Sequence, residues 1–567
     1  MLDQIQRWVP GVGTVRTYRR AWLSADLVAG VVLAAILVPQ GMAYAELAGL
    51  PAVTGLYTTI ACLVGYAAFG PSKVLVLGPD SSVSPMILAA ITPLLVTNDP
   101  ATAVALAGML ALMVGLIEIA LGLGKLGFVA DLLSNEVQIG YLNGLAVTIA
   151  VGQLPKLFGF STDADGFFEE VREFATNLDA TVGAALAVGL GVLAVLLVLP
   201  RFTRRIPAVL VAVVGATIVS AVLSLSDEGV STVGTLPQGF PAPSLPWTSF
   251  DDVGLLLLAA VGITLVSLTD TIATATAFAS RRGEEVQPDQ EMVGMGAANL
   301  ATGFFQGFAI STSASRTAVA EQSGAKSQLT GLVGAGIVVV LLLFLNGLVA
   351  DLPQPALAAV VIAAAISLTD FATLRRYWRV RRSALLLSVT ATLGVILFGV
   401  LQGILIAIIL AVLLFFHRSW WPRGAVLGHA DGLEGWHDLE DFPEAREEPG
   451  VVVYRWEAPL FFANSGSFRR QVRALADRPG TEWVIIQCEA ITDIDVTAAA
   501  MLETLDEELN RAGVHMAFVE MRSRLKEMAL HYGLLETLDV EHFYPSMEAA
   551  LEAVRAHRSP GDHPDGP

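Results

Sequence analysis

The chain has 567 residues, of which 54% are hydrophobic and 15% are charged, and its net charge is −19. This length exceeds that of one compact domain, and the apolar composition is typical of a polytopic membrane protein. After Leu427 the sequence holds 27 acidic and 12 basic residues, so this region carries −15 of the total charge. An acidic C-terminal region argues against nucleic acid as a partner. Two cysteines in different regions exclude a disulfide framework.

Between residues 23 and 420 the sequence predicts about fourteen apolar helical segments. Their ranges are 23–45, 52–69, 81–96, 101–123, 128–154, 182–199, 206–225, 253–279, 292–308, 313–321, 329–349, 355–368, 384–400 and 403–416. The third and the tenth segments are too short, and too polar at their starts, to span a bilayer alone. We therefore expect a polytopic α-helical membrane protein with two half-helices.

Basic residues are distributed as in a membrane protein whose two termini are cytoplasmic. They lie in alternate connections between segments: Lys73, Lys125, Arg201, Arg204, Arg205, Arg281, Arg282, Lys326, Arg375, Arg376, Arg379, Arg381 and Arg382. The opposite connections are almost free of bases, which is the positive-inside pattern. We expect a cytosolic segment at 1–22, a transmembrane domain at 23–420, and a location in the inner (plasma) membrane.

Two polar stretches open the half-helices, GPDSSVSPM at 78–86 and GFAISTSASRTAVAEQSGAKS at 307–327. Each combines hydroxyl side chains with one charge, Asp80 or Arg316. A helix N-terminus inside the membrane presents unpaired N–H groups and partial positive charge, so it suits an anion. Because the two segments are seven places apart, they suggest a seven-plus-seven inverted repeat with a midplane site. The alternative is a Ser/Thr-rich re-entrant loop whose Arg316 reaches outward to the interface.

After Trp421 the composition changes. Pro, Gly and acidic residues predict a linker at 421–449. The strand-like runs VVVYRW, WVIIQC and HMAFVE then alternate with helical patterns, which predicts a small cytosolic α/β domain at 450–557. The last residues, 558–567, are predicted to be a disordered tail.

Three stretches resemble one known family. PAVTGLYTTIACLVGYAAFGPS at 51–72 is similar to the sulfate permease (SulP) signature, and FAISTSASRTAVAEQSGAKSQL is similar to that family's tenth helix. The α/β region resembles a STAS domain. The resemblance implies a secondary anion transporter with core and gate subdomains and an anion held between the N-termini of helices three and ten. It also implies a homodimer, with the STAS domain contributing to assembly or regulation.

Eleven residues have expected roles: ten are implied by the resemblance, and Asp80 is added for its charge at the start of the third helix. The substrate contacts are Gln40, Tyr44, Ser81, Ser82, Ser313, Ala314, Ser315 and Arg316, and the coupling residues are Asp80, Asp270 and Thr274. By this resemblance, sodium-coupled bicarbonate members of the family carry Gly-Ala-Thr where this chain has Ser313-Ala314-Ser315, and they lack the arginine. Arg316 therefore places the chain nearer the sulfate and broad-anion branch. Asp80 is a further departure, since many animal members carry a neutral residue there.

Several of these assignments have structural alternatives. Asp270 is expected to be a counter-ion to Arg316 or a proton carrier, but the two could also form a fixed buried pair. Asp80 could cap the third helix or titrate beside the anion. Gln40 and Tyr44 could serve as contacts between packed helices.

The α/β region holds a weaker regulatory candidate in Asp495 and Thr497, which match the loop where related STAS proteins carry a phosphorylatable serine. A plain strand-to-helix turn with Asp495 near an N-cap is the alternative. The histidines have no metal-ligand spacing, and no nucleophile–base constellation is present, so we expect no metal, no cofactor and no enzyme activity.

The sequence thus predicts a secondary transporter of an inorganic oxyanion, sulfate first, coupled to protons. Bicarbonate or a dicarboxylate, with sodium or proton coupling, is the alternative within the class. A transporter-derived sensor that signals through its STAS domain is the alternative from another class. The expected partners are a small inorganic anion, a proton or sodium ion, membrane lipid and a second copy of the chain, without nucleic acid.

Overall fold

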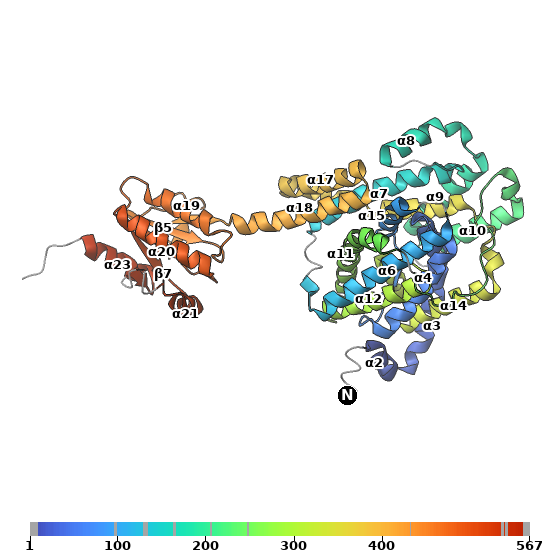
Figure 1. The fold of residues 1–567 in the computed structure, drawn as a ribbon, viewed down its shortest axis with the longest axis horizontal. Coiled ribbons are helices and arrows are strands. Elements are labelled where there is room, and N and C mark those ends of the chain that lie inside the picture. Colours follow the sequence, from blue (N-terminus) through green and yellow to red (C-terminus); the bar gives the residue numbers. More distant parts are fainter. Residues whose placement is uncertain are drawn as a thin grey trace, which may run out of the picture. The chain divides into compact units, whose positions relative to one another are not determined.

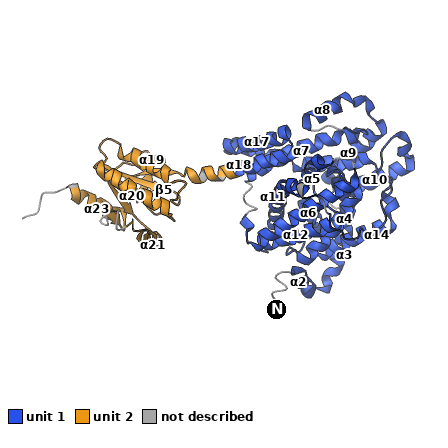
Figure 2. Cartoon of the chain, in the orientation of Figure 1, with its two compact units in different colours: residues 1–411 blue, residues 412–567 orange. Residues whose placement is uncertain are grey.

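The computed structural model describes residues 9–95, 99–128, 134–162, 166–203, 207–246, 249–430, 432–534, 538 and 542–558. The chain divides into two compact units, Met1–Ala411 and Val412–Pro567 (Figure 2). Residues 559–567 of the predicted disordered tail, and 1–8 of the predicted N-terminal segment, lie outside the described residues.

The first unit is built from α-helices (Figure 1). In chain order they are α2 (Pro10–Thr17), α3 (Leu23–Leu47), α4 (Ala52–Phe69), α5 (Ser84–Ile91), α6 (Pro100–Leu123), α7 (Asn135–Phe158), α8 (Phe167–Thr176), α9 (Gly183–Phe202), α10 (Ala208–Leu223), α11 (Phe250–Ser280), α12 (Pro288–Phe304), α13 (Ala314–Gln322), α14 (Leu329–Phe344), α15 (Gln354–Leu368), α16 (Phe371–Val380), α17 (Arg382–Phe398) and α18 (Val400–Trp420), the last of which runs into the second unit.

Each of the fourteen predicted segments coincides with one helix of the described chain: α3 to α7, α9 to α15, α17 and α18. Seven of the described helices are long and apolar enough to cross a membrane by length and composition alone. α5 and α13, at the third and tenth places, have only 8 and 9 residues. The predicted polytopic helical fold with two half-helices is confirmed.

The helices pack in two groups. The first helix group contains α3 to α6 and α11 to α14, and its closest pairs are α6 with α12, α4 with α12 and α3 with α14. The second helix group contains α7, α9, α10, α15 and α17, and α7 packs against α15, α17 and α9. α3 also contacts α15 and α10. This division matches the core and gate subdomains that the resemblance implied.

Small residues allow a close helix crossing. α6 and α12 meet at Gly115 and Gly296, where a Cβ on either residue would lie 2.7 or 2.6 Å from the carbonyl oxygen of the other. Without a hydrophobic driving force between helices in lipid, such backbone contact is a main source of association. The first helix group is therefore a closely packed body.

A two-stranded sheet joins the two half-helices. β1 (Leu77–Gly78) pairs antiparallel with β2 (Ser311–Thr312), so that Leu77 faces Thr312 and Gly78 faces Ser311. The Ser313 N–H also donates to the Val76 carbonyl oxygen at 3.1 Å. Because α5 and α13 begin shortly after these strands, the sheet brings their N-termini together.

The second unit contains a six-stranded sheet in the order β4-β3-β5-β6-β7-β8. The strands are β3 (Gly424–His429), β4 (Trp436–Asp438), β5 (Val451–Trp456), β6 (Trp483–Gln487), β7 (His515–Val519) and β8 (Phe543–Tyr544), and the helices are α19 (Ser465–Ala476), α20 (Val496–Arg511), α21 (Ser523–His531) and α23 (Met547–Arg558). β5 to β8 are parallel, as expected for alternating strands and helices.

The predicted linker at 421–449 needs correction. β3 pairs antiparallel with β5, and β4 pairs with β3, so this segment extends the sheet instead of only connecting two domains. Antiparallel strands at the edge of a parallel sheet are common in α/β folds. β3 and β4 are short and lie among Gly, Pro and acidic residues, so they give little sequence signal, which explains the error.

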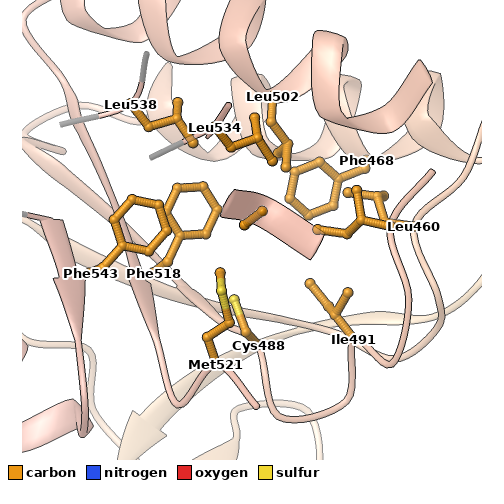
Figure 3. Close-up of a pocket in the computed structure, with 12 residues that line it drawn as sticks. Leu460, Phe468, Cys488, Ile491, Leu502, Phe518, Met521, Leu534, Leu538 and Phe543 are labelled. Carbon is orange, nitrogen blue, oxygen red and sulfur yellow. The ribbon is translucent and has the colours of Figure 1, made fainter. Parts of the chain in front are cut away.

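The core of the α/β domain is strongly apolar (Figure 3). A small cavity there is lined by Leu460, Phe468, Cys488, Ile491, Ile494, Leu502, Phe518, Met521, Ala529, Leu534, Leu538 and Phe543. Phe518 and Phe543 stack with centroids 5.1 Å apart. Burial raises the pKa of the Cys488 thiol to about 12, so this cysteine is a packing residue and not a reactive thiol.

Candidate functional site

Asp80 builds the turn that precedes α5. Its Oδ1 accepts hydrogen bonds from the Ser82 backbone N–H at 3.0 Å and from the Ser82 hydroxyl at 2.9 Å. Its carbonyl oxygen accepts from the Ser84 N–H at 3.0 Å. This is an Asx turn, and the N-cap position itself belongs to Val83. The N-cap role that we weighed for Asp80 is therefore not observed, because its Asx turn lies ahead of the cap; titration beside an anion stays a prediction.

Arg316, in the first turn of α13, is a buried cation with unused donors. It is 1% exposed, and its Nε, Nη1 and Nη2 have no hydrogen-bond partner among the described residues. Nη2 lies 3.6 Å from Asp80 Oδ2, which makes an ion pair but is too long for a hydrogen bond. Leaving buried charged donors unpaired is costly. The guanidinium therefore has unused capacity to donate hydrogen bonds to a further acceptor.

The N-terminus of α13 is open. Ser313 is its N-cap, with Oγ 3.4 Å from the Arg316 N–H that donates to it and 3.1 Å from Ser315 Oγ. Ala314 and Ser315 are exposed, although they lie within an apolar region. As the first two helical residues, they have backbone N–H groups without an intrahelical acceptor. Together with the helix dipole, these groups form a site suited to an anion.

Ser82 lies between two carboxyl groups. Its Oγ is 2.9 Å from Asp80 Oδ1 and 3.1 Å from Oδ2 of Asp270 on α11. Asp270 Oδ1 accepts a hydrogen bond from Gln138 Nε2 of α7 at 3.1 Å. A serine hydroxyl has a single proton to donate. Both Ser82 contacts can therefore be hydrogen bonds at the same time only when one carboxyl is protonated.

The expected pair of Asp270 with Arg316 is not formed; the ion pair of Arg316 is with Asp80. The sheet of β1 and β2 explains the difference, because it sets the residues just after Gly78 beside those just after Thr312. Asp270 is instead held by Ser82 and Gln138. The alternative of a fixed Asp270–Arg316 pair is wrong for the same reason.

Of the other predicted residues, Tyr44 and Ser81 lie beside this cluster. Tyr44 and Ser81 are 4% and 5% exposed, and the Tyr44 hydroxyl lies within electrostatic range of Asp80 and Arg316. Gln40 of α3 is half-buried and its Oε1 has no partner within the described chain, so its amide retains bonding capacity. Thr274 is buried one turn after Asp270 on α11.

Sequence reasoning missed three residues at this site. Gly78 leaves room for Arg316, since a Cβ there would lie 2.7 Å from Nη1. Gln138 binds Asp270, and the Tyr141 hydroxyl donates to the Ser82 carbonyl oxygen at 3.5 Å. The fifth segment was predicted to begin at 128, whereas α7 begins at Asn135, so Gln138 lies in the first turn of this helix.

A buried carboxyl outside this cluster positions the strand before α13. Glu118 of α6 accepts from the Ser267 hydroxyl at 2.9 Å and from the Asn299 side-chain amide at 2.8 Å. Asn299 Oδ1 in turn accepts from the Ile310 N–H at 3.0 Å. Three helices thus fix the backbone that enters β2. Glu118 is 0% exposed and supports the site without lying in it.

In the α/β domain, Asp495 is the N-cap of α20. Its Oδ1 accepts from the Ala498 N–H at 2.8 Å, and its Oδ2 accepts from the Phe462 N–H at 2.8 Å. Thr497 is exposed in the first turn of that helix. The capping role that we weighed for Asp495 is observed, and regulation at Thr497 stays a prediction.

Two facing half-helices in a polytopic helical unit, joined to a small α/β domain, define a membrane transporter with a STAS-like domain. The sulfate permease family model matches residues 23–392 and the STAS domain model matches residues 442–550. The chain belongs to the sulfate permease family. It is a multi-pass membrane transporter and not an enzyme.

Two relatives agree with membership of this family. A probable sulfate transporter of Mycobacterium tuberculosis is 40% identical over 550 residues, which cover 97% of this chain and 98% of the relative. The chloroplastic sulfate transporter 4.1 of Arabidopsis thaliana is 30% identical over 97% of this chain and 83% of its own length.

Two solved structures have the same fold. The murine solute carrier 26 family member A9 anion transporter, in the inward-facing state, has a TM-score of 0.88 and 25% identity, covering 98% of this chain and 95% of the other. The transmembrane domain of the cyanobacterial bicarbonate transporter BicA has a TM-score of 0.61 and 25% identity, covering 70% of this chain and 98% of the other.

Proposed function

We propose that this transporter moves an inorganic oxyanion, sulfate first, into the cell together with a proton. The anion binds between the N-termini of α5 and α13 and is exposed alternately to the two sides of the membrane. Gln40, Tyr44, Ser81, Ser82, Ser313, Ala314, Ser315 and Arg316 form its site, and Asp80, Asp270 and Thr274 form the coupling site.

The observation that carries the proposal is the state of Arg316. Its three guanidinium nitrogens have no hydrogen-bond partner within the described residues, and the open N-terminus of α13 lies in the same turn. An oxyanion supplies acceptors for both, and charge-assisted bonds of this kind are strong and geometrically selective. The names of the bacterial and plant relatives support sulfate as the first substrate to test.

The two carboxyls support proton coupling. Asp80 is paired with Arg316, whereas Asp270 contacts only neutral donors among its resolved hydrogen bonds. The Ser82 bridge between them accommodates one additional proton. Binding of an anion favours that proton, and by linkage the proton favours the anion by the same factor.

Bicarbonate is the second candidate, because the transmembrane domain of a bicarbonate transporter shares the fold. Arg316 and the Ser313-Ala314-Ser315 sequence favour the sulfate assignment. The positive-inside pattern supports an inner-membrane location with both termini cytoplasmic. We also propose that the chain forms a homodimer, as the family resemblance implied.

The test is the variant Arg316→Ala in proteoliposomes. Loss of a charge-assisted contact worth roughly 1.5–3 kcal/mol should weaken sulfate affinity about ten- to a hundredfold, because the anion loses its nearest cation. Uptake of labelled sulfate, bicarbonate and fumarate is measured with and without pH and sodium gradients.

A matched control is Arg282→Ala. Arg282 is also a basic residue of this unit, but it pairs with Glu321 through Nε at 3.2 Å, outside the site. Its removal should leave sulfate affinity within about twofold, as expected for a partly exposed pair. Normal sulfate affinity in Arg316→Ala would show that the arginine is structural. Uptake driven by sodium alone would favour the bicarbonate-type account.

A further inference from the structure

One hydrogen bond joins the coupling carboxyl to the opposite helix group. Asp270 lies on α11, which packs against α5, α6, α12 and β2 of the first helix group. Gln138 lies on α7, which packs against α8, α9, α15 and α17. The Gln138 Nε2 to Asp270 Oδ1 distance is 3.1 Å. This contact therefore crosses between bodies that must move relative to one another in alternating access.

The strength of this bond depends on the proton that the site carries. Ser82 Oγ contacts Asp80 Oδ1 and Asp270 Oδ2, so a complete hydrogen-bond set needs one proton beyond that of the serine. Asp80 is the carboxyl beside Arg316 and already accepts from the Ser82 N–H, so it is the better candidate for the ionised form. The proton then lies on Asp270 Oδ2, and Oδ1 receives Gln138 as a neutral carbonyl acceptor.

From this geometry we infer that Gln138 is the positioning residue through which the second helix group responds to the proton on Asp270. The inference rests on the proposed proton coupling. A carboxylate accepts a hydrogen bond about twice as strongly as a neutral carboxyl. In the anion-loaded carrier, ionised Asp270 thus holds α7 by the stronger bond, which raises the barrier to moving the two helix groups without a proton. Protonated Asp270 holds α7 weakly and allows the groups to move.

The other groups around Asp270 do not provide an equivalent charge-dependent hydrogen bond to α7. The ionisable groups that face Asp270 are Asp80, from the turn before α5, and Tyr141, from α7 itself. Arg316 and Tyr44 face Asp80. Tyr141 also donates to the Ser82 carbonyl oxygen, but at 3.5 Å and to a backbone group whose charge does not change. Gln138 is therefore the α7 side chain whose bond follows the charge of Asp270.

The experiment uses the full-length protein in proteoliposomes, with labelled sulfate as the probe. Uptake is measured in wild type, Gln138→Met and Gln138→Glu between about pH 5 and 8, over which the proposed proton coupling predicts a change in uptake. Gln138→Met has similar length but no donor. The midpoint of its profile of sulfate uptake against pH should move to higher pH by about one unit, which is a tenfold change in proton affinity. Accumulation against the sulfate gradient should fall, because the carrier moves without its proton.

Gln138→Glu should move the midpoint at least as far in the same direction, because a second carboxylate disfavours ionisation of Asp270. The matched control is Thr392→Val. Thr392 Oγ1 donates to the Gly140 carbonyl oxygen of α7 at 2.8 Å, within the second helix group. Its loss should leave the midpoint unchanged while removing one hydrogen bond from the same helix.

Three results would overturn the inference. A pH-dependent wild type with an unmoved midpoint in both Gln138 variants would remove Gln138 from the mechanism and leave proton coupling intact. A shift of equal size in Thr392→Val would make the effect one of general helix packing. A flat wild-type profile would remove proton coupling and the role of Gln138 together.

Discussion

Arg316 depends on the absence of a side chain at residue 78. Gly78 lies in β1, opposite Ser311, and a Cβ there would meet Nη1 of the guanidinium. The atom that must give way is the far end of a flexible side chain, so the strand can persist while the charge is displaced. The position of the cation is thus determined by a glycine in a different half of the unit.

Gly78→Ala should therefore lower sulfate affinity with little loss of folded protein. Overpacking at such a contact costs roughly 1–3 kcal/mol, and displacement of Nη1 should weaken sulfate binding by about tenfold or less. Sulfate binding and thermal unfolding are measured together.

The control for Gly78→Ala is Gly336→Ala on α14, where a Cβ would meet nothing within 4 Å. That change should keep sulfate binding and stabilise the helix slightly, since Ala is favoured over Gly by about 1 kcal/mol. Unchanged sulfate binding in Gly78→Ala would show that the guanidinium position does not matter for the anion.

For single residues, the sequence predicts the type of side chain at the site better than the partner of each side chain. The polar openings of both half-helices were visible as hydroxyls and single charges in apolar surroundings. Which carboxyl pairs with Arg316 depends on the register of β1 and β2, each only two residues long. Such short strands leave no periodicity, so the pairing with Asp80 and the role of Gln138 could not be predicted.

Among the elements, long apolar runs were predicted most reliably, because the bilayer fixes their length and composition. α4 spans Ala52–Phe69, the same residues as the predicted segment. α8 and α16 were not predicted as helices, because they are short, amphipathic and without buried residues. α16 carries Arg375, Arg376 and Arg379, three of the bases that the positive-inside pattern assigns to a cytoplasmic connection.

Asp495 gives a test at the level of one helix. Asp495→Ala removes the acceptor for the Ala498 N–H at the start of α20 and also the acceptor for the Phe462 N–H. Loss of an N-cap costs about 1 kcal/mol, or roughly fivefold in the opening equilibrium. Hydrogen exchange of the α20 amides should accelerate by about that factor.

Thr497→Ala, two residues further on, is the matched variant for Asp495→Ala. It removes an exposed hydroxyl from the same helical turn, and it should leave exchange nearly unchanged, as expected for surface positions. If Thr497→Ala alters sulfate uptake while the exchange of α20 stays constant, Thr497 has a regulatory role. Equal exchange rates in Asp495→Ala and wild type would remove the cap as a stabilising contact.

For the whole molecule, the two-unit organisation predicts which truncation is tolerated. α18 ends at Trp420, and β3, which begins at Gly424, belongs to the sheet of the second unit. A chain that ends after Trp421 keeps all fourteen predicted segments, whose backbone groups are satisfied within their own helices. A chain that ends after His429 keeps β3 without β5, and so exposes both of its edges.

The chain cut after Trp421 should insert and bind sulfate with unchanged preference over bicarbonate, since every proposed contact lies in the first unit. Its activity or abundance should fall, because we expect the STAS domain to contribute to assembly or regulation. The chain cut after His429 should be less soluble after extraction, because an unpaired strand recruits other chains. Size-exclusion profiles and paired uptake of sulfate and bicarbonate measure both effects. A changed ratio of sulfate to bicarbonate uptake in the Trp421 truncation would mean that the STAS domain takes part in anion selection, and the site would then have to extend beyond α5 and α13.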